Sequence, residues 1–268
     1  MQLLCPICGE FLVTEDRVMT CPNRHSFDIA RQGHVNLLPV QHKRSLQPGD
    51  TAEQVRSRRE FLEGGFYAPI AQALCDLASS HGCSGPIIDV GCGEGYYSVK
   101  LADHLNTELV GLDISKEAVR FAAGKYKSHR WLCASGAHLP IPNSSAGLLT
   151  SLFALTIPEE FRRVLREDGA FIQVLAAEDH LLGLKSIIYP ELTHKEKDSV
   201  PELPGFRLAE SRRLRFTFTV ENAQVQNLLS MTPHVYRIGK EGADRLRQTK
   251  TLTDTASVVL NLYFPEKG

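Results

Sequence analysis

The chain has 268 residues, of which 43% are hydrophobic and 23% charged, and its formal net charge is −1. This length fits a small module followed by one larger α/β domain. A nearly neutral chain argues against indiscriminate nucleic-acid binding, although a local basic face would be enough for a structured target. Because no run approaches the ~20 apolar residues of a membrane span and the N-terminus has no apolar signal core, we expect a soluble, cytoplasmic protein with no membrane partner.

Four potential metal ligands lie near the N-terminus. Cys5 and Cys8 form a C-x2-C step, and Cys21 and His25 form a C-x3-H step after twelve intervening residues. Two tight turns can then present two ligands each, which is typical of a tetrahedral zinc site. Because protein side chains fill all four positions, we interpret the predicted Zn2+, one per chain, as structural. The segment has too few apolar side chains to bury a core alone, and metal binding would supply folding energy.

A linker and several basic clusters follow this module. Residues 40–51 have the composition of a linker, with prolines at 39 and 48 and a glycine at 49. The basic clusters are His42, Lys43 and Arg44; Arg56, Arg58 and Arg59; Arg212, Arg213 and Arg215; and Arg245, Arg247 and Lys250. The ordinary interpretation of each cluster is a solvated surface. The first two nevertheless flank the junction, beside the cleft that two modules would form.

The rest of the chain alternates helical and strand patterns. Apolar spacing predicts helices over 52–61 and 69–78, a strand over 87–90, a helix over 96–105 and a strand over 108–113. Further strands are predicted over 131–135, 147–155, 170–175, 214–220 and 256–264, with a helix over 158–165. Together these elements predict a doubly wound, mostly parallel sheet whose binding site lies at the carboxyl ends of the strands.

A glycine-rich loop joins the strand over 87–90 to the next helix. Gly91, Gly93 and Gly95 follow Asp89 and permit a tight turn and close approach of a ligand to the backbone. Asp113 ends the next strand, where a carboxylate can bind both hydroxyls of a ribose. The glycines lack the G-x-G-x-x-G spacing with which a dinucleotide site meets pyrophosphate. Their order resembles the first motif of class I S-adenosylmethionine-dependent methyltransferases.

The most specific segments lie in both modules. They are Cys5-Pro-x-Cys8, Cys21-Pro-x-x-His25-x-Phe27-Asp28, Gly33-x-Val35-Asn36-Leu37-Leu38, His42-Lys43-Arg44-Ser45-x-x-Pro48-Gly49-Asp50 and Asp89-Val90-Gly91-Cys92-Gly93-Glu94-Gly95-Tyr96-Tyr97. Together they resemble the RlmA-type 23S rRNA (guanine-N1)-methyltransferases, from Cys5 almost to the C-terminus. The resemblance implies a zinc ribbon over residues 1–37 that helps to recognise RNA, a basic linker and helix over 38–65, and a Rossmann-like, class I methyltransferase domain over 66–268.

The resemblance also implies the activity and the ligand contacts. The protein would use S-adenosylmethionine to methylate N1 of a guanine in a 23S rRNA hairpin that lines the exit tunnel, and a homodimer is left open. Tyr67, the Gly93-Glu94 pair and His180 match family positions that contact the cofactor. An aromatic face at Tyr67 could make a cation–π contact of ~1 kcal/mol with the sulfonium. The ordinary alternatives are a core tyrosine and a surface histidine. The predicted cofactor-binding set is Tyr67, Asp89, Gly91, Gly93, Glu94, Asp113 and His180.

The segment after the fourth predicted strand departs from the family pattern. Relatives usually have Phe-Ser-Pro or Tyr-Ala-Pro-Cys there, whereas this chain has Phe153-Ala154-Leu155-Thr156-Ile157-Pro158, with the proline displaced and no cysteine. The altered segment puts the fine substrate specificity in question, and with it the activity.

No catalytic residue is assigned from the sequence. An Asp/Asn-Pro-Pro-aromatic motif for exocyclic amines is absent, and neither Cys92 nor Cys133 is placed to attack a pyrimidine. Guanine N1 needs only alignment with the methyl group and loss of one proton, for which Glu159, Glu160 or water are candidates. Two alternatives stay open: a small-molecule methyltransferase that has acquired a zinc ribbon, and a catalytically silent RNA-binding protein.

Overall fold

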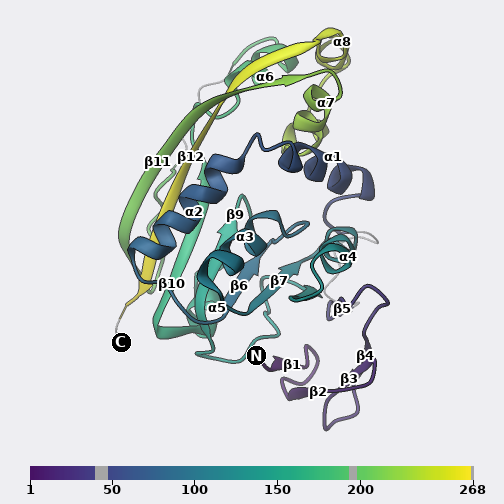
Figure 1. Ribbon diagram of the computed structural model, residues 1–268, viewed down its shortest axis with the longest axis vertical. Helices are drawn as coiled ribbons and strands as arrows, with labels where there is room; N and C mark the ends of the chain where they lie inside the picture. Colours follow the sequence, from purple (N-terminus) through teal and green to yellow (C-terminus); the bar gives the residue numbers. More distant parts are fainter. Residues whose placement is uncertain (40–47, 193–197, 267–268) are drawn as a thin grey trace.

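The computed structural model describes residues 1–39, 48–192 and 198–266. Its strands form a small N-terminal sheet and a large sheet that is covered by helices (Figure 1). The basic run of His42, Lys43 and Arg44 lies outside the described residues, as does most of the predicted linker. No helix in the described part of the chain is long and apolar enough to cross a membrane.

The small sheet is antiparallel and carries the predicted metal ligands in its turns. Its strands, in spatial order, are β1 (Leu3–Leu4), β2 (Phe11–Glu15), β3 (Val18–Thr20) and β4 (Ser26–Asp28). Cys5 and Cys8 lie between β1 and β2, and Cys21 and His25 lie between β3 and β4. Strands of this length cannot bury a core between them, which agrees with a fold that depends on a metal.

The large sheet has the order β11-β12-β10-β9-β6-β7-β8-β5. Its strands are β5 (Val35–Asn36), β6 (Ile87–Val90), β7 (Leu109–Asp113), β8 (Arg130–Cys133), β9 (Ala146–Leu152), β10 (Leu165–Ala176), β11 (Phe206–Glu221) and β12 (Thr251–Pro265). The strands from β5 to β10 pair in parallel, whereas β12 pairs antiparallel to both β10 and β11. The predicted α/β fold with a mostly parallel sheet is confirmed.

Helices and the small sheet cover both faces of the large sheet. The helices are α1 (Ala52–Glu63), α2 (Ala68–Ser80), α3 (Tyr96–Leu105), α4 (Lys116–Lys125), α5 (Pro158–Val164), α6 (Leu182–Ile188), α7 (Ala223–Ser230) and α8 (Lys240–Gln248), with a 3₁₀ helix at Pro233–Tyr236. Successive strand residues enter two apolar clusters: Ile87 packs with α2, α3 and α4, whereas Ile88 packs with α5 and the small sheet. Burial on both faces explains why the central strands are almost wholly apolar.

The two modules share one of these clusters. Leu3, Cys5 and Cys21 of the small sheet belong to the same buried group as Val90 and Val110 of the large sheet. The backbone also links them, because the Leu4 amide donates a hydrogen bond to the Pro140 carbonyl at 2.9 Å. At the opposite end of the predicted zinc module, β5 extends the large sheet by pairing with β8.

The C-terminal hairpin differs most from the sequence-based prediction. The predicted strands over 214–220 and 256–264 are shorter than β11 and β12, which have 16 and 15 residues. The hairpin runs along one side of the molecule to α7 and α8 at its far end (Figure 1). The first half of β11 is rich in exposed or half-buried charged residues, so apolar patterning predicted only the part over 214–220. Helices α4, α6, α7 and α8 were not predicted.

Candidate functional site

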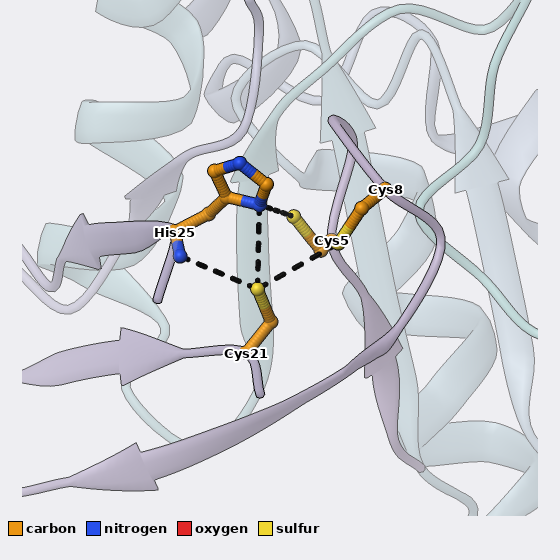
Figure 2. Close-up of side chains that lie close together, drawn as sticks. All are labelled: Cys5, Cys8, Cys21 and His25. Carbon is orange, nitrogen blue, oxygen red and sulfur yellow. Dashed lines mark hydrogen bonds between the residues drawn. The ribbon is translucent and has the colours of Figure 1, made fainter. Parts of the chain in front are cut away.

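The four predicted metal ligands converge on one point of the small sheet (Figure 2). Their ligand atoms all lie within 4.8 Å of one another. The sulfurs of Cys8 and Cys21 are 3.7 Å apart, and His25 Nδ1 lies 3.4 Å from the Cys21 sulfur and 3.5 Å from that of Cys5. Tetrahedral zinc, with Zn–S near 2.3 Å, has S···S and S···N edges of roughly 3.8 and 3.6 Å. The donor set therefore fits one zinc ion with closed coordination.

The backbone around these ligands forms two tight turns. The Gly9 amide donates to the Cys5 carbonyl and the Arg24 amide to the Cys21 carbonyl, both at 2.9 Å. The His25 amide also points at the Cys21 sulfur, at 3.3 Å, where it would stabilise a thiolate (Figure 2). In the ranges that the structure describes, this is the one group of three or more potential ligands close enough to hold a metal.

The glycine loop joins β6 to α3 at the carboxyl end of the large sheet. Gly91, Gly93 and Gly95 have positive φ angles of 80°, 54° and 87°, which favour glycine. At Gly91 the space is also closed, because an added Cβ would lie 2.5 Å from the Ala154 side chain. The backbone of the loop at Gly91 therefore packs directly against the Ala154 methyl group, and no side chain fits between them.

Asp113 fastens this loop to the end of β7. Its two carboxylate oxygens accept hydrogen bonds from the Gly93 amide at 2.9 Å and the Ser115 amide at 2.8 Å. Desolvation raises the pKa of Asp113, while the two amides and the Arg58 charge lower it. A carboxylate oxygen can accept more than one hydrogen bond, so the arrangement leaves acceptor capacity for ribose hydroxyls.

Asp89 holds the loop from beneath. Its carboxylate is buried and accepts hydrogen bonds from the hydroxyls of Ser98 on α3 and Thr150 on β9, the latter at 2.7 Å. Burial raises the pKa of Asp89 to about 6, although both hydroxyls lower it. Asp89 therefore connects three neighbouring elements of the fold at the point where the loop begins.

Glu94 is the buried acid with unused hydrogen-bonding capacity. Only 4% of the residue is exposed, and its Oε2 has no hydrogen-bond partner within the described part of the chain. Burial raises the pKa of Glu94 to about 7, while the positive charge of Arg58 lowers it. An unsatisfied buried carboxylate next to the glycine loop is suited to accept a hydrogen bond from a ligand.

Arg58 and Asp50 are residues whose place the sequence did not reveal. They form an ion pair, and Arg58 Nη1 lies 3.6 Å from the position that a Cβ on Gly93 would occupy. The Asp50 carbonyl accepts a hydrogen bond from the Ser115 hydroxyl at 2.7 Å. This contact brings α1 over the loop from the junction between the modules. In the sequence, Arg58 was visible only as one member of a basic cluster.

Tyr67 and His180, 113 positions apart, lie side by side, with Tyr67 Oη 3.3 Å from His180 Nε2. The Ser257 amide donates to His180 Nδ1 at 3.1 Å. This hydrogen bond assigns the proton of a neutral imidazole to Nε2, which can then donate to Tyr67. The Tyr67 hydroxyl keeps its own proton for another acceptor, since burial raises its pKa. The pair can therefore present one O–H donor to a ligand.

The C-terminal hairpin positions this pair. Phe218 of β11 packs edge-on against the Tyr67 ring with the centroids 5.6 Å apart. Asp254 of β12 accepts hydrogen bonds from the amides of Gly183 and Leu184 at 2.9 and 2.7 Å, which anchors the start of α6 just after His180. The sequence suggested both site residues and missed the hairpin contacts that hold them.

The segment that departs from the family pattern carries two exposed apolar side chains, one of which, Phe153, lies beside His180. Phe153 has a φ of 55° and is 43% exposed, and Leu155 is 70% exposed. The ring centroids of Phe153 and His180 are 6.2 Å apart. An exposed aromatic ring at the carboxyl end of a parallel strand is suited to stack on a planar substrate.

The two suggested general bases lie at the start of α5. Glu160 accepts hydrogen bonds from the Leu139 amide at 2.6 Å and from Arg163 at 2.7 Å. Burial raises the pKa of Glu160, but the Arg163 and Leu139 hydrogen bonds outweigh it and lower the pKa. Its oxygens are thus engaged in holding the loop before β9, and Glu159 is exposed on the same helix. Neither geometry identifies a catalytic base.

Comparisons with known proteins match both modules. The family model described as "RlmA, N-terminal", a zinc ribbon, matches residues 3–46, and a methyltransferase-domain model matches residues 87–169. A solved structure of a candidate type II methyltransferase from Anaeromyxobacter dehalogenans aligns with a TM-score of 0.50 at 19% identity, covering 71% of this chain and 94% of that one. It shows the same methyltransferase fold.

Two relatives extend the match over most of the chain. The 23S rRNA (guanine(748)-N(1))-methyltransferase of Streptomyces fradiae is 33% identical over 246 residues, which cover 86% of this chain and 84% of the relative. A candidate 23S rRNA (guanine-N(1)-)-methyltransferase of Micromonospora griseorubida is 37% identical over 203 residues, 68% of each chain. With the zinc ribbon and the methyltransferase fold both present, the chain belongs to the RlmA-type family of 23S rRNA (guanine-N1)-methyltransferases.

Proposed function

We propose that this protein methylates N1 of a guanine in a hairpin of 23S rRNA near the exit tunnel, with S-adenosylmethionine as methyl donor. The main observation behind this proposal is that one chain contains both a Cys3His cluster and a glycine loop held by Asp113. The modules that carry them share one apolar core. The named activity of the Streptomyces relative supports the same reaction.

The proposed division of labour follows the modules. Residues 1–37 form the zinc-binding module, with Cys5, Cys8, Cys21 and His25 as ligands, and help to recognise the RNA. Residues 38–65 form the basic linker and helix, and residues 66–268 carry the chemistry. This substrate implies a cytoplasmic location. The family resemblance left a homodimer open, and sedimentation of the full chain would show whether the protein is a monomer or a dimer.

The cofactor site combines the predicted residues with one addition. The bound cofactor supplies an electrophilic methyl group. Asp113 would hold the ribose, the glycine loop would admit the ligand close to the backbone, and the Tyr67 hydroxyl would donate to its carboxylate. Arg58 balances the buried charge of Glu94 and Asp113, so we add it as a residue that positions the cofactor loop. The predicted members Asp89 and His180 would act mainly by fixing the loop and the tyrosine.

Alignment of the target base is the main catalytic task in this proposal. The exposed Phe153 ring beside His180 offers a stacking surface, and stacking of a base on an aromatic side chain contributes roughly 1–3 kcal/mol. Methylation of a ring nitrogen then requires the nitrogen and the methyl group to be held in line, with loss of one proton.

The test is methylation of 23S rRNA taken from cells that lack the enzyme, with labelled cofactor. N1-methylguanine blocks the pairing edge of the base, so reverse transcription should stop at the modified position. Label in small molecules of an extract, without a stop in the RNA, would instead support the small-molecule alternative. RNA binding without any label transfer would support the silent RNA-binding alternative.

A further inference from the structure

A cavity of about 220 Å³ lies between α1 and α4, outside the cofactor site. It is lined by Ala52, Val55, Arg56, Arg59, Glu117, Arg120 and Phe121. The lining positions of α1 are spaced as one helical face, and those of α4 form a matching face, so the two helices present these side chains to each other. Arginine supplies most of the polar lining.

The charges in this cavity do not cancel. Arg120 pairs with Glu117 at 2.5 Å, whereas Arg56 has no ion-pair partner among the described residues. Arg59 lies over the Phe121 ring, 4.6 Å from its centroid, and its Nε is buried without a hydrogen-bond partner in the described chain. Three guanidinium groups therefore face one carboxylate.

Glu63 forms a long ion pair with Arg59 but leaves the Arg59 Nε without a hydrogen bond. The Arg59 Nε lies 3.8 Å from one oxygen of Glu63, which is beyond hydrogen-bond distance, and Lys125 holds the other oxygen at 2.6 Å. A buried donor without a partner is costly. The cavity is thus prepared for an additional anion that can accept several N–H hydrogen bonds.

The size and position of the cavity indicate which anion. Its volume is below the ~300–1,000 Å³ of typical small-molecule sites, so it suits a single group such as a phosphate. The neighbouring Arg58 of α1 reaches the cofactor loop, and α4 begins just after Asp113. Figure 1 places α4 between α1 and the small sheet. A polymer that runs from the zinc ribbon to the cofactor site would pass this cavity.

We propose that Arg56, Arg59 and Arg120, the arginine pocket, bind a phosphodiester group of the RNA substrate. This assignment rests on the proposed function. The guanidinium fork matches phosphate oxygens, and phosphate contacts fix the position of an RNA without reading its sequence. The arginine pocket would hold the RNA in register between the zinc ribbon and the methyl-transfer site.

A second arginine in the same chain provides a matched control. Arg207 also lies over a phenylalanine ring, 5.8 Å from the centroid of Phe264. The cavity beside it is lined by Glu167, Asp168 and Glu266, so its charge is opposite to that of the arginine pocket. Both sites contain an arginine on an aromatic ring, and only one of them should attract phosphate.

The experiment measures the affinity of the full, zinc-loaded chain for a 23S rRNA transcript over a series of KCl concentrations. Arg56→Gln and Arg120→Gln should each weaken binding about tenfold at low salt and reduce the slope of log K against log[salt] by about one. The Arg56→Lys variant should keep the slope. Arg207→Gln should match the wild type, and cofactor affinity and melting temperature should be unchanged in all four variants.

The outcomes separate this proposal from the function on which it rests. Wild-type affinity and slope in Arg56→Gln and Arg120→Gln would overturn the arginine pocket and leave the methyltransferase proposal intact. Failure of the wild type to bind the transcript would overturn both. A further measurement records the melting temperature of each variant with added inorganic phosphate or pyrophosphate. If either anion stabilises the wild type but not Arg59→Gln, while RNA affinity is the same in all variants, the pocket binds free anions and the RNA assignment is wrong.

Discussion

The zinc ribbon and the cofactor site are built in opposite ways. The metal ligands span residues 5 to 25 and come together through two turns of the local backbone. The proposed cofactor site combines residues as distant as Asp50 and Ser257, and each is held by a contact with another element. A local site can be identified from spacing, whereas a distributed site depends on the whole sheet. The shared core of Cys5, Cys21 and Val110 nevertheless couples the two.

Loss of a zinc ligand is the strongest test of this contrast. Cys8 is exposed, so Cys8→Ala removes a ligand with little change to the core. Structural zinc contributes an apparent ~10–16 kcal/mol in small modules, so we expect the metal content to fall from one ion per chain to almost none. RNA methylation should be lost while cofactor affinity stays within a few-fold of wild type. Metal analysis, a 23S rRNA methylation assay and cofactor titration measure these three quantities, with Cys83→Ala as the cysteine control. A fully active Cys8→Ala enzyme would refute the recognition role of the ribbon.

The buried acid Glu94 predicts a pH dependence that belongs to the cofactor site alone. Burial raises the pKa of Glu94 from its ordinary 4.5 to about 7, so the folded chain binds the proton more tightly than the unfolded chain. Folding stability from this group should therefore fall as pH rises from about 4.5 to 7, by on the order of 3 kcal/mol.

The Glu94→Gln variant has no ionisable group at this position, so it should not show the loss of folding stability that ionisation of Glu94 causes. Its free energy of unfolding should exceed that of the wild type by an amount that grows between pH 5.5 and 7 and levels off above pH 7, measured by urea denaturation of the zinc-loaded, cofactor-free protein. Asp89 titrates in the same direction in both proteins, because burial raises its pKa to about 6. A constant difference between the two proteins over this range would show that Glu94 is ionised throughout.

Asp113→Asn tests the distributed site without touching the ribbon. The amide lacks the charge and one acceptor oxygen, so the bond to the Gly93 or Ser115 amide and a ribose contact are weakened together. Hydrogen bonds to charged groups contribute about 1.5–3 kcal/mol, which corresponds to a loss of roughly 10- to 100-fold in cofactor affinity. Calorimetric titration measures it, and Asp103→Asn, at an exposed carboxylate, is the control. Unchanged affinity would place the ribose elsewhere.

The smallest expected effect concerns the contact between Gly91 and Ala154. Gly91→Ala adds a Cβ 2.5 Å from Ala154, and Ala154→Gly should relieve that overlap. We expect a coupling energy of about 1 kcal/mol in the double-mutant cycle, measured by denaturant unfolding. Gly33→Ala has a similarly positive φ of 106° with open space around it, so it reports backbone strain alone. Additive effects at Gly91 and Ala154 would mean that the segment after β9 moves away.

Elements with dense local signals were predicted well. The strand over 87–90 and the helix over 96–105 match β6 and α3, because an apolar run broken only by Asp89 ends in a glycine loop that marks their common boundary. Elements stabilised by distant contacts were not. Residues 206–213 of β11 include several charged side chains, and they form a strand because β12 pairs with β11 along its length. Tertiary pairing there outweighs local pattern.

The same division holds for the functional residues. By itself, the sequence determined the Cys3His cluster and the family, and it predicted the glycine loop with its acid at Asp113, because these depend on residue type and short spacing. Only the tertiary structure decided that Arg58 lies over Gly93, that His180 meets Tyr67, and that three arginines of α1 and α4 face one cavity. Such contacts join residues far apart in the chain, and their geometry is fixed by packing of the sheet and its helices, which no local pattern encodes.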